Sequence, residues 1–130
     1  MDLIKVSPNK ERAKSILKMI SLLEERILIQ DKERMTALII TDYYEIVKEL
    51  ITALLFIDGY KTLSHKELID YIKEYPEFST YEISIINDLR ILRNRVAYEG
   101  FFVEVSYLNR NENNFKKIIK KLKQIVNKKI

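Results

Sequence analysis

The residues best suited to chemistry lie together in one stretch of the sequence, residues 88–102, DLRILRNRVAYEGFF. The stretch contains Arg90, Arg93 and Arg95, with Asn94 between the last two and a tyrosine shortly after them. Guanidinium groups bind phosphate and carboxylate oxygens through paired hydrogen bonds, and amide and phenol groups can donate further ones. We therefore consider a charged helix face, a nucleic-acid contact and an active site.

Helical geometry divides these side chains between faces. An apolar stripe would hold Ile85, Leu89, Leu92 and Val96. Arg90 and Arg93 flank this stripe, Arg95 points elsewhere, and Asn94 and Tyr98 are close enough in the helix to meet. Arg93 and Tyr98 are about 140° apart around a straight helix, so we expect them not to meet. A site that uses both needs a bent helix or a second subunit, which favours a homodimer with two such helices side by side.

The segment LRNRVAYEG resembles the motif of the HEPN superfamily, helical domains often encoded beside minimal nucleotidyltransferases. That motif is an arginine, usually followed by asparagine, histidine or aspartate, and then, several residues later, a histidine. Arg93 and Asn94 match its opening. The segment YYEIVKELITALLFIDGYKTLSHKELIDYI is similar to the long helix, glycine turn and next helix start of such proteins. The likeness spans nearly the whole chain.

The resemblance implies one HEPN-like helical bundle domain over residues 1–130. It also implies a homodimer and a minimal nucleotidyltransferase as partner, as in toxin–antitoxin pairs. In active members, the arginine and the histidine pair across a dimer cleft and cleave RNA without metal. Tyr98 takes the position of that histidine, and a tyrosine pKa near 10 makes it a poor base at neutral pH. Its phenol can still donate a hydrogen bond to phosphate.

Three functions follow from these residues. In the first, Arg90, Arg93, Asn94 and Tyr98 bind the phosphate of a nucleotide or RNA, and catalysis is impaired. In the second, the protein is a metal-independent endoribonuclease toxin with Arg93, Asn94 and Tyr98 as catalytic residues. In the third, it is a structural partner subunit, where Arg93 and Asn94 form a buried polar network that fixes the dimer register and Tyr98 packs.

Other catalytic chemistry has little support in the sequence. His65 is the one histidine and there is no cysteine, so a zinc site lacks ligands. We interpret His65 as a surface or half-buried residue in the first turn of a helix. Asp42, Glu45 and Glu49 would share a helix face and could hold a divalent ion, although such sets more often pair with lysine or arginine. No glycine-rich phosphate loop is present, and we expect neither cofactor nor metal.

Helices must position these residues, because the apolar spacing is helical in five segments and no strand pattern competes. This predicts an all-α fold, an antiparallel four-helix up-down bundle with an additional short helix. The expected helices cover residues 8–29 and 32–58, a short segment from Ser64 to Pro76, a segment from Ser79 to Gly100, and a last helix from about Asn111. The segment FFVEVSYL before the last helix is expected to be an extended connection.

Local signals suggest where these helices begin and end. Ser7 is expected to cap the first helix, with Pro8 at its first position. Gly59 suits the left-handed residue that ends the second helix. The pair Ser64 and Glu67 and the pair Ser79 and Glu82 each have the spacing of a capping box.

The charge of this 130-residue chain is uneven. The net charge is +4, but the last twenty residues hold seven lysines and one glutamate, so they carry +6 and the rest carries −2. Such a helix is usually a solvated face that complements the helix dipole, with contact to RNA or an acidic partner as the alternative. The longest apolar run, ITALLFI, is too short to span a bilayer, so we expect a soluble, cytoplasmic protein without membrane contact.

Overall fold

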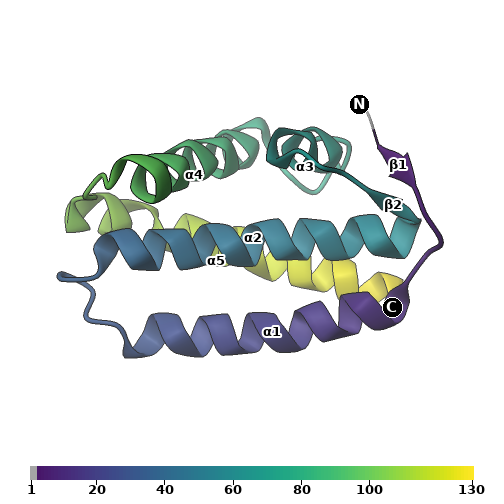
Figure 1. The fold of residues 1–130 in the computed structure, drawn as a ribbon, viewed down its shortest axis with the longest axis horizontal. Coiled ribbons are helices and arrows are strands. Elements are labelled where there is room, and N and C mark those ends of the chain that lie inside the picture. The colour runs from purple at the N-terminus through teal and green to yellow at the C-terminus, as the bar shows by residue number, and fades with distance from the viewer. Residues whose placement is uncertain (1–2) are drawn as a thin grey trace.

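A computed structural model describes residues 3–130 and shows a mostly helical protein with one very small sheet (Figure 1). Its elements in chain order are β1 (Ile4–Lys5), α1 (Lys10–Ile29), α2 (Thr36–Asp58), β2 (Tyr60–Lys61), α3 (His65–Ile72), α4 (Thr80–Glu99) and α5 (Val105–Lys129). The helical character expected from the sequence is confirmed. The two short strands, which pair in an antiparallel fashion, were not predicted.

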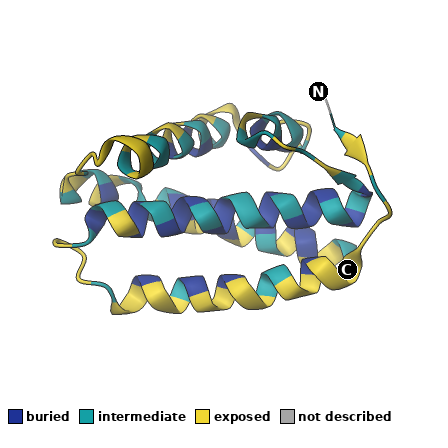
Figure 2. Cartoon of the chain, viewed as in Figure 1, coloured by how far each residue is buried: buried dark blue, intermediate teal, exposed yellow. Residues whose placement is uncertain are grey.

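The second helix, α2, is the centre of the molecule. It contacts α1, α3, α4 and α5, and α1 and α4 lie on opposite sides of it (Figure 1). Its surface is therefore dark blue or teal over most of its length, whereas α1 shows a continuous exposed face (Figure 2). The sequence explains this difference, because α2 is apolar nearly all round and α1 has one apolar stripe. The most deeply buried side chains of α2 include Ile40, Ile46, Leu50, Ile51 and Leu54.

The start of α1 differs from the expected one. The helix is capped by Asn9, whose side-chain oxygen accepts from the backbone N–H of Arg12, and neither Ser7 nor Pro8 belongs to it. The reason lies in a distant part of the chain. The backbone N–H of Val6 donates to the carbonyl of Gly59, and that of Asn9 donates to the carbonyl at position 56. These bonds keep the segment extended along the end of α2, so the helix begins only after Asn9.

The limits of α2 are set by two turns. Asp31 accepts the backbone N–H groups of Glu33 and Arg34 through its carboxylate, and this turn delays the helix from the expected residue 32 to Thr36. At the other end, Gly59 adopts the left-handed conformation, with φ of 86°. The predicted glycine termination of α2 is confirmed.

The two predicted capping boxes have different outcomes. At α4, the hydroxyl of Ser79 accepts from the backbone N–H of Glu82, and the Glu82 carboxylate accepts from that of Ser79, as expected. At α3, Ser64 precedes the helix but makes no side-chain capping bond, and this prediction is wrong. The carboxylate of Glu67 instead accepts the hydroxyl of Thr62, so the partner needed for the box is already occupied.

The last helix begins earlier than expected. It starts at Val105 rather than near Asn111, and only residues 101–104 form the extended connection. Leu108 is completely buried and lies seven residues before the buried Phe115, so it extends the apolar stripe by two turns. The polar run after Leu108 hides this continuity in the sequence. The predicted apolar face from Phe115 to Val126 is confirmed.

The apolar stripe of α4 weakens towards its carboxyl end. Ile85 and Leu89 are buried, but Leu92 and Val96 are only half-buried. This leaves the carboxyl half of α4, which carries the arginine motif, at the edge of the core. No helix within residues 3–130 is long and apolar enough to cross a membrane.

Candidate functional site

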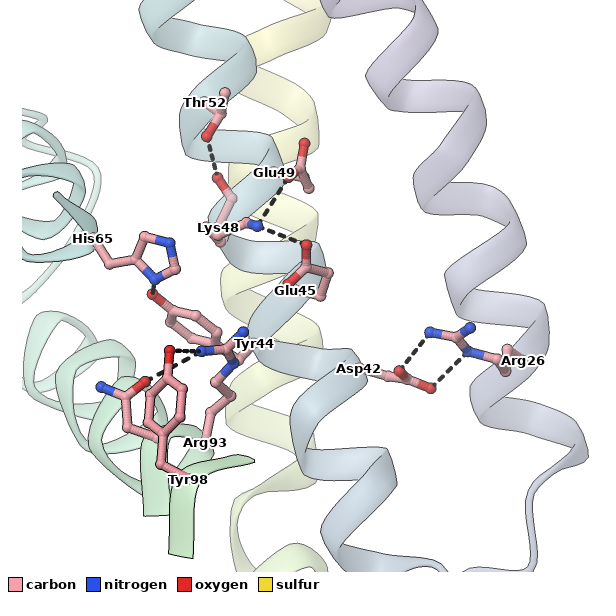
Figure 3. Close-up of polar contacts among 11 residues, drawn as sticks. Arg26, Asp42, Tyr44, Glu45, Lys48, Glu49, Thr52, His65, Arg93 and Tyr98 are labelled. Atoms are coloured by element: carbon pink, nitrogen blue, oxygen red, sulfur yellow. Dashed lines mark hydrogen bonds and ion pairs between the residues drawn. The ribbon is translucent and has the colours of Figure 1, made fainter. Parts of the chain in front are cut away.

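Three helices bring five polar side chains together on one side of α2 (Figure 3). We call this set the Arg93 cluster, and its members are Tyr44 from α2, His65 from α3, and Arg93, Asn94 and Tyr98 from α4. Tyr44 is buried in the core with its hydroxyl 3.1 Å from Nδ1 of His65. The packing of α3 and α4 against α2 therefore assembles the cluster.

The guanidinium of Arg93 lies between two tyrosine rings. Its Cζ is 5.8 Å from the ring centre of Tyr44 and 5.9 Å from that of Tyr98, within the range of cation–π attraction. Its Nη1 donates to the side-chain oxygen of Asn94 at 3.3 Å and makes a long contact of 3.5 Å with the phenol oxygen of Tyr98. Neutral groups thus hold the guanidinium in place without cancelling its charge.

Arg93 and Tyr98 meet on one helix, and the expectation that they cannot is wrong. Two physical features account for this. Helical side chains lean towards the amino end of their helix, which brings the Tyr98 ring back over the preceding turn. The arginine side chain is also long enough to bend along the helix surface. Neither a sharp bend of α4 nor a second subunit is needed to bring these two residues together.

Arg93 has unused hydrogen-bonding capacity. Its Nε is buried and has no hydrogen-bond partner. Within residues 3–130, neither Arg93 nor Arg90 forms an ion pair, whereas the guanidinium of Arg26 binds both oxygens of Asp42 at 3.1 and 2.7 Å. A buried donor without a partner is unfavourable by about 1–3 kcal/mol, and more for a charged group. Within residues 3–130, neither the charge nor the Nε donor of Arg93 is therefore satisfied by another residue.

The three arginines of the motif make different contacts. Arg90 donates from Nε and Nη2 to the side-chain oxygen of Asn87, at 3.3 and 3.2 Å, and its charge acts on Tyr44 and His65. Arg95 turns away, as expected. It lies 3.6 Å from the carboxylate of Glu99 and stacks on a phenylalanine ring in the connection to α5. Of these three arginines, only Arg90 and Arg93 act on the cluster through their charge.

Burial fixes the protonation states of two members of the cluster. It raises the pKa of Tyr44 to about 12, against the opposing effect of the Arg90 and Arg93 charges. It lowers the pKa of His65 below its usual 6.5, and the charges of Lys48 and Arg93 act in the same direction. At neutral pH, Tyr44 is therefore a neutral phenol and His65 a neutral imidazole.

Sequence reasoning missed the part that Tyr44 and His65 play. His65 is indeed half-buried in the first turn of α3, as expected, but its ring reaches Tyr44. The two residues are 21 positions apart, and no local spacing links them. Arg90, Arg93, Asn94 and Tyr98 were all selected from the sequence.

The acidic residues of α2 are held by nearby cations (Figure 3). Asp42 binds Arg26 and Gln30, while Glu45 and Glu49 lie 2.6 and 3.1 Å from the ammonium of Lys48. In the described part of the chain, no group of three histidine, cysteine or acidic residues is placed to hold a metal ion. The three carboxylates therefore act as ion-pair partners.

Comparison of the chain with protein-family models, curated proteins and solved structures gives no match. The chemistry of the cluster is nevertheless distinctive. It combines one half-buried cation, Arg93, with the phenols of Tyr44 and Tyr98 and the amide of Asn94, all of which can donate hydrogen bonds. The nearby carboxylate of Glu45 is occupied by Lys48. Such an arrangement suits an oxyanion with several acceptor oxygens, of which phosphate is the most common.

Proposed function

We propose that the protein is a HEPN-like helical domain whose Arg93 cluster binds the phosphate of a nucleotide or of RNA. The main support is the guanidinium of Arg93, which is half-buried and forms no ion pair within residues 3–130. A phosphate can accept from the two terminal nitrogens of a guanidinium at once, in a paired geometry that arginine favours. Bound there, it would balance a charge that no carboxylate of the described residues balances.

The other residues have roles that follow from their positions. Asn94 and Tyr98 already contact Nη1 of Arg93, so their amide and phenol groups lie where they can donate to the same phosphate. Arg90 adds a second positive charge that acts on the cluster. These are also the four residues that the motif selects in the sequence.

The resemblance extends the proposal to fold and partners. The four long helices, α1, α2, α4 and α5, would form the antiparallel up-down bundle of the HEPN superfamily. The domain would act as a homodimer and partner a minimal nucleotidyltransferase in a toxin–antitoxin-like pair. Exposed apolar side chains on the carboxyl half of α4 and in the connection after it support a dimer, since Ile91, Tyr98 and Phe102 leave a large part of their surface uncovered.

The direct test is binding of a fluorescently labelled RNA oligonucleotide, followed by anisotropy. We expect Arg93→Ala to weaken binding by about tenfold to a hundredfold, the effect of losing a charge-assisted hydrogen bond. The matched control is Arg95→Ala on the same helix, whose guanidinium faces Glu99 and is expected to change the Kd by less than about twofold. Equal Kd values for the wild type and Arg93→Ala would overturn the proposed site.

A metal-independent endoribonuclease is the second candidate. One observation favours it, because His65 brings a neutral imidazole to the cluster from α3, although the motif position holds Tyr98. Imidazole can accept a proton near neutral pH, which a phenol does poorly. The third candidate, a purely structural subunit, predicts that no variant of Arg93 alters RNA binding.

A further inference from the structure

A pocket of about 340 Å³ lies next to the Arg93 cluster. It is enclosed by the carboxyl half of α2, the segment 60–64 and the beginning of α3, and its walls include Lys48, Thr52, Leu55, His65 and Leu68. The sequence motif contributes no residue to it. Its volume is at the lower end of the range typical of small-molecule sites.

His65 connects this pocket to Arg93. Its ring forms part of the pocket wall and at the same time contacts the hydroxyl of Tyr44 at 3.1 Å. The centre of the Tyr44 ring is 5.9 Å from that of the His65 ring and 5.8 Å from Cζ of Arg93. The His65 wall of the pocket and the guanidinium of Arg93 are therefore no more than about 12 Å apart. A nucleotide, whose base and phosphate lie on either side of a ribose, has a comparable span.

The two lysines of the pocket differ from Arg93 in their surroundings. The ammonium of Lys48 is held by Glu45 and Glu49, at 2.6 and 3.1 Å, so its charge is already balanced. Lys61 lines the pocket as an exposed residue, where water screens its charge. Arg93, in contrast, is half-buried and has no ion-pair partner within residues 3–130. A ligand that reaches both places would put its anionic group at Arg93 and a neutral group in the pocket.

The walls also suit a planar polar ring. Leu55 and Leu68 are buried and give an apolar surface, and Leu63 is 88% exposed where it lines the pocket. Thr62 and Ser64 bring hydroxyl groups. His65 keeps Nε2 for a ligand in either tautomer: as a donor if Tyr44 donates to Nδ1, and as an acceptor if Nδ1 donates to Tyr44.

We infer that this pocket holds the nucleoside part of a nucleoside monophosphate unit whose phosphate lies at Arg93, with His65 binding at the junction. The inference rests on the proposed function, because the phosphate is the one assigned to Arg93. It adds a second subsite and a ligand class to that function. The unit can be a free nucleotide or part of an RNA strand, since both carry the same base, ribose and phosphate.

The test compares ligands by isothermal titration calorimetry on the full chain. Inorganic phosphate and ribose 5-phosphate report on the Arg93 position alone, and AMP and UMP report on both subsites. We expect AMP or UMP to bind at least tenfold more tightly than the two ligands without a base. A short RNA identifies the source: tighter binding by a trinucleotide assigns the unit to a strand, and weaker binding assigns it to a free nucleotide.

Two variants locate the subsite. Thr52→Leu narrows the pocket from α2 and should abolish the advantage of AMP while leaving the affinity for inorganic phosphate unchanged. Leu63→Ser changes an exposed residue, so it cannot disrupt the core, and should weaken AMP binding severalfold. Leu28→Ser is its matched control, because Leu28 is similarly exposed and lies on α1, away from this pocket.

Different results would contradict the nucleoside subsite and the proposed phosphate site. If AMP, UMP and inorganic phosphate bind the wild type equally, the nucleoside subsite is wrong and the phosphate site stands. The same conclusion follows if Leu63→Ser and Leu28→Ser bind AMP as the wild type does. If no phosphate-bearing ligand binds, or if Arg93→Ala binds inorganic phosphate as the wild type does, the proposed function itself is wrong.

Discussion

Arg93 differs from Arg95 in its surroundings and not in its chemical type. Both lie in α4, but Arg95 faces Glu99 in solvent whereas Arg93 is set between two tyrosine rings with a buried Nε. An exposed ion pair is worth little, because water competes with it. A half-buried guanidinium without a carboxylate has no such compensation from the protein. These surroundings are the reason why we propose Arg93, and not Arg95, as the binding residue.

We propose that Tyr98 determines whether a phosphate bound at Arg93 is also cleaved. We predict that wild-type protein, incubated with RNA in the presence of a chelator, shows no cleavage above that of Arg93→Ala. Tyr98→His places a group with a pKa near neutrality at that position, and general acid–base catalysis is worth about a hundredfold or more. We therefore expect this variant to gain cleavage, and the double variant with Arg93→Ala to lose it.

The controls for this experiment separate the two candidates. Gel analysis of the RNA with and without chelator excludes metal-dependent contaminants. Wild-type cleavage that disappears in His65→Gln would contradict the prediction and favour the ribonuclease. Tyr98→Phe keeps the ring but removes the hydroxyl, so it shows whether the phenol contributes to binding.

Only part of the candidate site could be foreseen from the sequence. Arg93, Asn94 and Tyr98 stand out because a short spacing relates them. Tyr44 and His65 could not be recognised, since their contact depends on how α3 packs against α2. The angle between Arg93 and Tyr98 was a sound guide to backbone positions, but it took no account of the length and lean of the side chains.

At the scale of the elements, the turn after α2 holds distant segments together. Gly59 has a positive φ and accepts a hydrogen bond from Val6, and a Cβ at this position would lie 2.9 Å from the carbonyl oxygen of Val6. The same turn leads into β2 and then α3, which carries His65. Glycine is therefore required at position 59 for two reasons. Its backbone is left-handed, and the Val6 backbone lies too close to leave room for a Cβ.

This reasoning can be tested by comparing two glycines. Gly100 also has a positive φ, of 63°, but a Cβ there would meet no atom within 4 Å. We expect Gly100→Ala to lower the free energy of unfolding by about 1 kcal/mol, from backbone strain alone. Gly59→Ala adds the contact with Val6 and is expected to lower it by about 3 kcal/mol. Urea denaturation measures both, and equal losses would show that the contact relaxes freely.

The starts of α1, α3 and α4 show which of the predicted capping signals form in the structure. The capping box at the start of α4 forms although the Glu82 carboxylate also binds Lys121, because a carboxylate oxygen can accept from more than one donor. The signal near Ser7 fails because distant residues, Gly59 and residue 56, hold the chain before α1. The box at Ser64 fails for a local reason, because Thr62 binds the carboxylate of Glu67. Helix identity could thus be predicted from apolar spacing, while the start of α1 depended on contacts outside the local sequence.

At the scale of the whole molecule, lysines of α5 form ion pairs with three other helices. Lys121 binds Glu82 of α4, Lys123 binds Glu24 of α1 and Lys129 binds Asp58 of α2. Three of its seven lysines therefore reach three different helices, and the positive charge of this segment is partly neutralised within the fold. Each exposed pair contributes little alone. Together they fix the orientation of α5 over the core.

The exposed apolar side chains at the end of α4 should govern assembly. Phe102, which lines a groove together with Ile91 and Arg95, is 87% exposed, and Tyr98 of the Arg93 cluster is 77% exposed. We expect sedimentation to show a dimer of about twice the chain mass of 15.5 kDa. Phe102→Asp places a charge in this surface and should yield a monomer. Leu28→Asp, at an equally exposed position on α1, should leave the dimer intact. If Leu28→Asp abolished the dimer and Phe102→Asp did not, the interface would lie on α1 instead.

The central position of α2 affects the order in which the protein comes apart. Helices at the periphery can open with a partial loss of contacts, but α2 loses its four neighbours only when the whole fold is lost. Its amide hydrogens will therefore exchange with solvent on the timescale of global unfolding, and those of α1 sooner. Tyr44 belongs to this most persistent helix. The Tyr44 ring, which lies against the guanidinium of Arg93, is therefore expected to stay in place until the whole protein unfolds.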